Sequence, residues 1–430
     1  MLASMSATDP FLTRYARGTR AMTASEIRAL FSVAARPEIV SLAGGSPYTA
    51  ALPMDDIREL VDGVLASEGP TALNYSGGQG DPRLREVLTD LMREEGIGAS
   101  ADDIVVTVGS QQALDLLGRM FCDPGDVVVA EGPSYVGALS AFSQYQVEVA
   151  HVPMDADGLD PVALGETLDR LAAEGRRVKF LYTVPNFHNP AGVTLHADRR
   201  DQVLEIAKRH DVLVVEDNPY GLLGFDHQVP DALRARDRDN VVYLGTLSKI
   251  FCPGLRVGWA LVPPALRDRL ILLKEAADLC SSNLAMAVAY HYFADNPWRE
   301  TIKTFREVYR ERRDTTLDAL REGFGEMGAD VTWNVPDGGF YVWVTLPEQL
   351  DTRAMLPKAI NARVAYVPGN AFYADDRSGA SSLRLCYSFP PPERIREGVR
   401  RLTGVVAEEL DLIRALGGDM HAGRSGRPVS

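Results

Sequence analysis

Between about residue 100 and residue 262, short runs of β-branched residues alternate with stretches that have the apolar periodicity of amphipathic helices. Strands that are apolar on both faces and separated by helices form sheets covered by helices on both sides, with mostly parallel strands and right-handed crossovers. The pattern therefore predicts an α/β fold with a mostly parallel, seven-stranded sheet built from residues 103–108, 126–130, 147–152, 178–184, 212–216, 241–245 and 257–262.

The rest of the chain is organised differently. After residue 264 come long helical stretches, a hairpin-like pair of strands in DVTWNV and GGFYVWVTL, and a C-terminal amphipathic helix. A chain of 430 residues is long enough for about two domains, and strands grouped apart from a parallel sheet predict a smaller α+β domain. We expect a large domain at 45–290, a small domain made of 1–44 and 291–416, and a disordered, Gly/Ser/Arg-rich tail at 417–430.

The charge and composition exclude several classes of protein. The 45 Lys and Arg residues against 59 Asp and Glu residues give a net charge of −14, which disfavours a nucleic acid partner because phosphate backbones require a basic surface. No apolar run of about 18 residues is free of charges, so we expect no membrane span. The N-terminal sequence has no apolar run of signal-peptide length and the cysteines form no CxxC pair, so we expect a cytoplasmic protein with no metal site.

Ligands of open α/β sheets bind at the carboxyl ends of the strands, so the polar residues that follow each predicted strand are the candidates for function. Ser110 and Gln111 open a helix after the first strand, and the free N–H groups and dipole there favour a phosphate, although an ordinary N-cap explains Ser110 equally well. The other strand ends carry an amide, an acid with a tyrosine, and hydroxyls with a lysine and an arginine: Asn189, Asp217, Tyr220, Thr246, Ser248, Lys249 and Arg256.

Each of these residues has a plainer explanation when it is taken alone. Most lysines at strand ends reach solvent, although desolvation can turn such a lysine into a nucleophile, and an acid there can form an ordinary salt bridge. We interpret His188 as a loop residue, because no second His or Cys lies at metal-ligand spacing. The combination, however, suits pyridoxal 5′-phosphate, whose aldehyde needs an amine, whose ring nitrogen needs an anion and whose phosphate needs hydroxyls and a cation.

Longer motifs extend this combination along nearly the whole chain, from SEIRALF and LAGGSP through NYSGGQGDP, EGPSY, PNFHNPAG, VVEDNPYG and TLSKIFCPGLRVGW to LRLCYSF. With these motifs the chain resembles the class I/II aminotransferases of the fold-type I pyridoxal-phosphate family, and it looks closest to the 2-aminoadipate and multi-substrate aminotransferase branch. The resemblance implies a pyridoxal 5′-phosphate enzyme that acts on a small-molecule amino acid and a 2-oxo acid, as a homodimer with shared active sites.

The resemblance also implies a role for each matching residue. Lys249 is expected to form the Schiff base and to carry a proton between substrate and cofactor, while Asp217 pairs with the ring nitrogen. Asn189 and Tyr220 match positions that hydrogen-bond the 3′-oxygen of the cofactor, and Tyr135 matches the aromatic residue that stacks on the ring. The residues expected at the phosphate are Ser110, Gln111, Thr246, Ser248, Arg256 and, across the dimer, Tyr75.

The substrate site is implied in the same way. Arg384 matches the residue that binds the substrate α-carboxylate, with Gly45 and Asn189 nearby, and Arg28 matches a position that can pair with an acidic side chain. The simpler interpretations are a strand arginine in a surface salt bridge and an exposed helix arginine. The family loop is closer to PxFQNPTG than to this chain's PNFHNPAG, and this difference leaves the preferred substrate open.

The implied function is transfer of the amino group of an L-amino acid to a 2-oxo acid, with 2-oxoglutarate as the expected acceptor, by a ping-pong Schiff-base mechanism. The alternative keeps the fold and the cofactor but has the Cα carbanion undergo elimination, decarboxylation, cyclisation or oxidation. A third hypothesis is the aminotransferase-like sensor of a transcriptional regulator, which the net charge of −14 disfavours.

Overall fold

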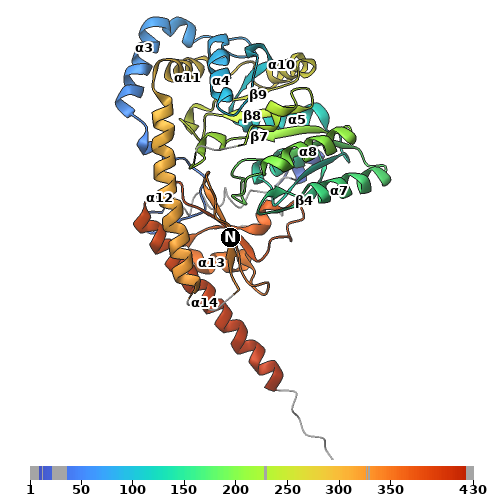
Figure 1. Cartoon of the computed structure of the whole chain (residues 1–430), viewed down its shortest axis with the longest axis vertical. Helices are drawn as coiled ribbons and strands as arrows, with labels where there is room; N and C mark the ends of the chain where they lie inside the picture. The colour runs from blue at the N-terminus through green and yellow to red at the C-terminus, as the bar shows by residue number, and fades with distance from the viewer. Residues whose placement is uncertain are drawn as a thin grey trace, which may run out of the picture.

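The computed structural model of the chain describes residues 9–11, 13–21, 36–226, 230–325, 327 and 330–422. Its largest sheet has eight strands in the order β2-β9-β8-β7-β6-β3-β4-β5 (Figure 1). In chain order the strands are β2 (Ile104–Thr107), β3 (Val127–Gly132), β4 (Glu148–Asp155), β5 (Gly158–Leu159), β6 (Val178–Thr183), β7 (Leu213–Asp217), β8 (Val241–Thr246) and β9 (Gly258–Leu261).

All of the predicted strands are present in this sheet. The five strands β4, β3, β6, β7 and β8 pair in parallel, which confirms the prediction from the alternation with helices. Strand β9 is antiparallel to both β2 and β8, so the sheet is mixed. The predicted count of seven strands was wrong, because the two-residue strand β5 pairs antiparallel with β4 and is too short to show a periodic pattern.

Helices cover both faces of this sheet. Those that share a hydrophobic core with one face are α5 (Gly109–Phe121), α6 (Val136–Ser143) and α10 (Pro264–Asp278). Those that share a core with the other face are α7 (Pro161–Ala173) and α8 (Ala197–Arg209). A further group at the β2 side of the sheet consists of α3 (Met54–Ala72), α4 (Pro82–Arg93) and α11 (Asn283–Asp295) (Figure 1).

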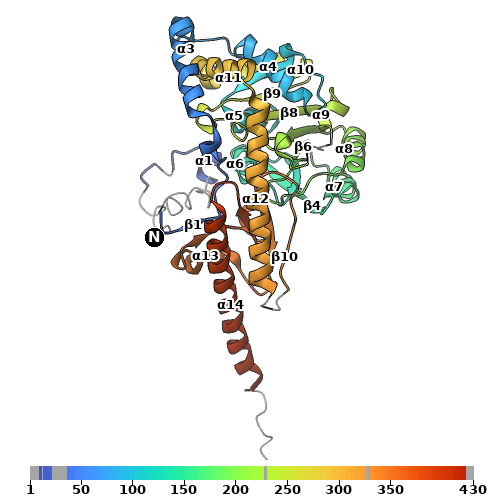
Figure 2. The same cartoon turned by 60° about the vertical axis from the view of Figure 1, so that its left-hand side comes forward.

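A second, smaller sheet lies apart from the first (Figures 1 and 2). Its four strands are antiparallel in the order β10-β11-β14-β13, which confirms a small α+β part built on the predicted hairpin. The N-terminal strand β1 pairs in parallel with β12 and so joins this part. The bounds of these strands are β1 (Val40–Ser41), β10 (Thr332–Trp333), β11 (Tyr341–Thr345), β12 (Val364–Ala365), β13 (Val367–Pro368) and β14 (Ser382–Cys386).

The long helix α12 (Trp298–Gly325) connects the two parts, since in both views it runs from α11 to α13 (Thr352–Asn361) and α14 (Pro392–Ala422). Helix α14 continues to Ala422, into the stretch expected to be a disordered tail, and residues 423–430 lie outside the described part. The domain boundaries remain a prediction.

The remaining helices are short: α1 (Arg17–Ala21) and α9 (Leu233–Arg236). None of the helices in the described ranges is both long and apolar enough to cross a membrane.

Candidate active site

A pocket of about 550 Å³ opens where the carboxyl ends of the parallel strands face the smaller sheet. Nearly every residue that the sequence predicted for the site lines this pocket, which confirms that the strand ends meet. The predicted residues found there are Gly45, Ser110, Gln111, Tyr135, Asn189, Asp217, Tyr220, Thr246, Ser248, Lys249, Arg256 and Arg384.

Lys249 follows β8 and presents its amine to the pocket. Its Nζ donates a hydrogen bond to the carbonyl oxygen of Gly45 at 2.8 Å and lies 5.7 Å from the centre of the Phe340 ring. Burial lowers the pKa of Lys249 to about 8, and the positive charges of Arg384 and Arg256 act in the same direction. Near neutral pH a far larger fraction of Lys249 than of an ordinary lysine is therefore a neutral, nucleophilic amine.

Asp217 ends β7 and is almost completely buried. The Tyr182 hydroxyl donates to its Oδ2 at 2.9 Å, whereas its Oδ1 is buried with no hydrogen-bond partner among the residues that the structure describes. Burial raises the pKa of Asp217 to about 7, and the bond from Tyr182 and the charge of Lys249 oppose this rise. An unpaired buried carboxylate oxygen requires a donor, and the N–H of a protonated pyridine ring provides one.

A cup for an anion lies at the beginning of α5. No side chain of the described residues caps the first turn of this helix, so its N–H groups remain available to a ligand. Arg256 Nη1 and the Thr246 hydroxyl both donate to Ser248 Oγ, at 3.4 and 3.0 Å, which gathers a cation and two hydroxyls at one side of the pocket. Gly109 has φ at +71°, and a Cβ at this position would lie 2.5 Å from Arg256 Nη2 and would displace the guanidinium from the cup. This donor set fits a phosphate group.

Arg384, on β14, reaches across from the smaller sheet. Its Nη1 donates to Asn189 Oδ1 and its Nη2 donates to the carbonyl oxygen of Ala43, both at 2.7 Å. The guanidinium also lies over the ring of Tyr341, 4.3 Å from its centre. Arg384 is only 2% exposed and these partners are neutral, so the simpler interpretation of a surface salt bridge was wrong. Its positive charge is therefore available to bind a substrate carboxylate.

Asn189 and Tyr220 lie together, as the resemblance implied. The Asn189 amide donates to the Tyr220 hydroxyl at 3.5 Å, and this hydroxyl lies 3.2 Å from that of Tyr341. Tyr341 was not predicted as a site residue, because its strand belongs to the other sheet and its spacing from the remaining site residues carries no signal. Tyr182 was not predicted either, because its position inside a continuous apolar strand is typical of an ordinary core residue.

His188 is a loop residue, as predicted, but the loop is buried. Its Nε2 lies 3.0 Å from Glu131 Oε2, and its Nδ1 accepts a hydrogen bond from the N–H of Ala191 at 3.2 Å. These contacts support the turn that carries Asn189. Within the described ranges, no group of three or more His, Cys, Asp or Glu residues is arranged to hold a metal ion.

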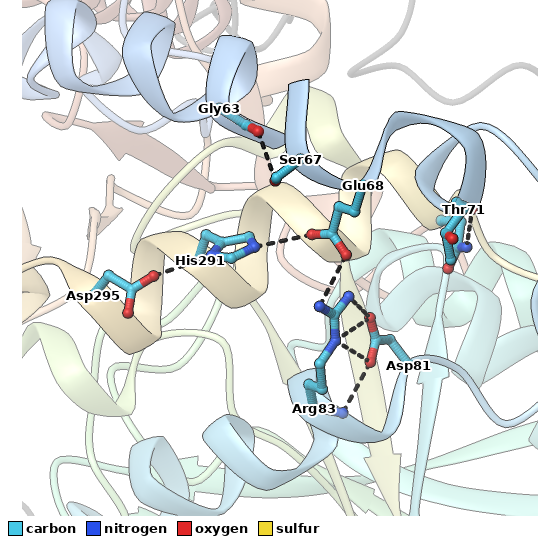
Figure 3. Close-up of polar contacts among 9 residues, drawn as sticks. Gly63, Ser67, Glu68, Thr71, Asp81, Arg83, His291 and Asp295 are labelled. Atoms are coloured by element: carbon cyan, nitrogen blue, oxygen red, sulfur yellow. Dashed lines mark hydrogen bonds and ion pairs between the residues drawn. The ribbon is translucent and has the colours of Figure 1, made fainter. Parts of the chain in front are cut away.

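The structure does not place two of the predicted residues in this pocket. Arg28 falls outside the described residues. Tyr75 is 78% exposed on the segment between α3 and α4, away from this chain's own pocket. Ion pairs brace the helices on either side of this segment: Glu68 contacts both Arg83 and His291, each at 2.9 Å (Figure 3).

Known proteins match the chain over nearly its whole length. The family described as aminotransferase class I and II matches residues 37–402. Aromatic-amino-acid aminotransferase 1 of Thermococcus litoralis is 42% identical over 391 residues, which are 90% of this chain and 93% of that protein. The crystal structure of a multiple substrate aminotransferase from Thermococcus profundus has a TM-score of 0.88 at 39% identity and covers 94% of this chain and 100% of that one.

A third relative bears on the cofactor. The crystal structure of α-aminoadipate aminotransferase from Thermus thermophilus, complexed with N-(5′-phosphopyridoxyl)-L-leucine, has a TM-score of 0.85 at 33% identity and covers 93% of this chain and 99% of that one. The amine, the unpaired carboxylate oxygen and the anion cup of this pocket suit the parts of such a group, and the cofactor is pyridoxal 5′-phosphate. The chain therefore belongs to the class I and II aminotransferases, in the branch of the multiple-substrate, aminoadipate and aromatic enzymes, and is a transaminase.

Proposed function

We propose that this transaminase moves the amino group of an L-amino acid to a 2-oxo acid, with 2-oxoglutarate as the acceptor, in a ping-pong cycle. The observation that carries the proposal is the presence of Lys249, Asp217 and Arg384 in one pocket. They supply a base, an anion for the ring nitrogen and a binding group for a substrate carboxylate. Donor and acceptor both carry an α-carboxylate, so one set of residues serves both half-reactions.

Proton transfer falls to Lys249. Bound pyridoxal 5′-phosphate supplies an electron sink, which makes the Cα proton of the amino acid acidic. Lys249 Nζ takes this proton from Cα and delivers it to the carbon that was the cofactor aldehyde. Its pKa of about 8 suits this task, because a general base works best when its pKa lies near the working pH. Asp217 Oδ1 accepts the ring N–H and keeps that nitrogen protonated.

Substrate orientation falls to Arg384. Its two terminal nitrogens, which now donate to Asn189 and to the Ala43 carbonyl, match the spacing of the two oxygens of a carboxylate. The ring of Tyr341 packs on the guanidinium and restricts its movement. Tyrosine and aliphatic side chains also line the pocket, so we propose aromatic amino acids as donors, together with acidic ones if Arg28 pairs with the side chain.

A homodimer with shared sites belongs to the same proposal. Tyr75 supports it, because at 78% exposure its side chain is open to contact by a partner subunit. Leu73 and Leu279, at 70% and 56% exposure, are further large apolar side chains left open to solvent. In the dimer, the Tyr75 hydroxyl of one subunit would donate to the phosphate bound by the other. A cytoplasmic location also remains a proposal.

The test separates the two half-reactions. Purified enzyme is mixed with single L-amino acids in the absence of an oxo acid, and conversion of the cofactor from its aldehyde to its amine form is followed by absorbance. Addition of 2-oxoglutarate then restores the aldehyde form and yields glutamate. Lys249→Ala abolishes both steps, whereas Lys179→Met, a matched change near the opposite end of the strands, leaves them intact. Release of ammonia or carbon dioxide without the amine form would instead establish one of the other carbanion reactions.

A further inference from the structure

A chain of buried polar side chains lies behind the pocket and joins two of its loops. Arg200 Nη2 donates to Asn186 Oδ1 at 2.6 Å, and Asn186 Nδ2 donates to Asn218 Oδ1 at 3.1 Å. Asn218 Nδ2 in turn donates to Glu95 Oε1 at 3.0 Å. All four side chains are buried, with Glu95 the most exposed at 7%. Buried bonds of this kind are costly to break because no water replaces the lost partner.

The direction of the hydrogen bonds in this series of side chains is determined by the groups at its two ends, Arg200 and Glu95. A guanidinium can only donate, so Arg200 requires the oxygen of Asn186 to face it. Each following amide must then present its oxygen toward Arg200 and its NH₂ group toward Glu95. The last amide therefore needs an acceptor, and Glu95 Oε1 provides it whether the carboxyl is ionised or protonated on Oε2. A side chain without an oxygen at position 95 leaves Asn218 Nδ2 unpaired and allows both amides to shift.

The two amides flank residues that hold the cofactor. Asn218 directly follows Asp217, and Asn186 lies in the loop that carries Asn189. Glu95 itself lies outside the pocket, in the connection after α4, and borders a separate cavity of about 20 Å³. Its other oxygen accepts a bond from the hydroxyl of Tyr243 on β8, the strand that leads to Lys249. The carboxyl is thus bonded both to the segment that follows β7 and to strand β8.

The fit around Glu95 is tight. A Cβ on Gly221, in the turn that follows Tyr220, would lie only 1.7 Å from Glu95 Oε1 and 2.8 Å from Asn218 Nδ2. The backbone of the same connection is anchored as well, since the carbonyl oxygen of Glu95 accepts from the N–H of Ala232 at 3.0 Å. Neither the carboxyl nor its connection is therefore free to follow a displaced amide.

We infer that Glu95 is a positioning residue, which holds the Asp217 and Asn189 loops at the separation that the cofactor ring requires. The inference rests on the cofactor roles proposed for these two residues, and it needs no assumption about the amino acid substrate. Glu95 touches neither cofactor nor substrate and acts through Asn218 and Asn186.

The test compares Glu95→Met, which removes the acceptor, with Glu95→Gln, which keeps an oxygen for Asn218. Pyridoxal 5′-phosphate is titrated into each cofactor-free variant, and its Kd and the thermal midpoint of the free protein are measured. Asp126→Met is the matched control, because Asp126 is also a buried carboxylate but lies at the amino end of β3 and pairs with Arg177 and Lys179. This readout does not depend on transamination, so a failure of the proposed donor or acceptor leaves it intact.

We expect Glu95→Met to raise the Kd by about tenfold or more, the effect of one unpaired buried donor, whereas Glu95→Gln stays within about threefold of the unaltered protein. Asp126→Met lowers the midpoint but leaves the Kd unchanged. Asn186→Ala removes the bonds of Asn186 to Arg200 and Asn218, so it should raise the Kd by a similar factor. If Glu95→Met does not fold, the Kd of Asn186→Ala is the deciding measurement. An unchanged Kd in Glu95→Met or in Asn186→Ala, or an equal rise in Asp126→Met, would overturn the inference.

Discussion

Burial of Lys249 controls the pH at which this chain binds its cofactor covalently, because only a neutral amine attacks an aldehyde. An amine with the ordinary pKa of 10.5 is neutral in about one molecule in 3,000 at pH 7. With the lowered pKa of about 8, about one molecule in eleven is neutral at the same pH. At equal intrinsic reactivity, Lys249 should therefore capture pyridoxal 5′-phosphate about 300 times faster at pH 7 than an unperturbed lysine.

The shape of the pH profile follows from the same value. Below pH 8 the second-order rate constant should rise about tenfold per pH unit, because the neutral fraction rises in that proportion. Above pH 8 the rate should level off. Burial is the main cause of the shift, and the nearby Arg384 and Arg256 charges add to it, whereas Asp217 opposes it.

Stopped-flow mixing of cofactor-free protein with pyridoxal 5′-phosphate between about pH 6 and 11 measures this profile. The reference is a blocked lysine derivative in the same buffers, whose rate should continue to rise until its ordinary pKa of about 10.5. A protein profile that rises without a bend to above about pH 9.5 would show that the pocket does not displace the lysine titration. Burial would then not lower the pKa of Lys249 in the way that the structure predicts.

Three further changes test the site and its surroundings. Tyr182→Phe removes the hydroxyl that donates to Asp217 Oδ2, and since a buried bond to a charged group contributes about 1.5–3 kcal/mol, cofactor affinity should fall about 10- to 100-fold in a fluorescence titration. Arg384→Lys removes the forked donor pair, so kcat/KM for the amino acid should fall about 10- to 100-fold in steady-state assays, with an unchanged cofactor spectrum. Glu68→Gln weakens both ion pairs drawn in Figure 3, and because such partly exposed pairs contribute about 1 kcal/mol or less each, the free energy of unfolding in a denaturant titration should fall by no more than about 2 kcal/mol.

The strand ends were the part of the site that the sequence could predict. Lys249, Asp217 and Asn189 each follow an apolar strand, and a parallel sheet brings such positions to one edge. The predicted placement of these residues depends only on the periodicity of the strands, so the wrong strand count did not affect it. Strand β5 escaped prediction because two residues carry no periodic signal, yet its absence from the prediction changed no site residue.

The side chains that complete the site from other elements could not be predicted in this way. Tyr341 enters from β11, and Arg384 was placed only through the resemblance, because the packing of one sheet against another leaves no spacing in the sequence. Glu95 was missed for a different reason. An acid at the end of an amphipathic helix normally faces solvent, and only the folded connection shows that it is buried against Asn218.

Lys249 and Asp217 together make the cofactor and the fold interdependent. The pKa of Asp217 is raised to about 7, so in the cofactor-free protein its contribution to stability is lost as the pH rises from about 4 through 7. The pKa of Lys249 is lowered to about 8, so its contribution is lost as the pH falls from about 10.5 through 8. Near pH 7 most of the Lys249 amines and about half of the Asp217 carboxyls are therefore charged, in a site that disfavours charge. Pyridoxal 5′-phosphate relieves both penalties, because its aldehyde consumes the amine and its ring nitrogen pairs with the carboxylate. The groups that make this pocket reactive are thus the ones that destabilise it when the cofactor is absent.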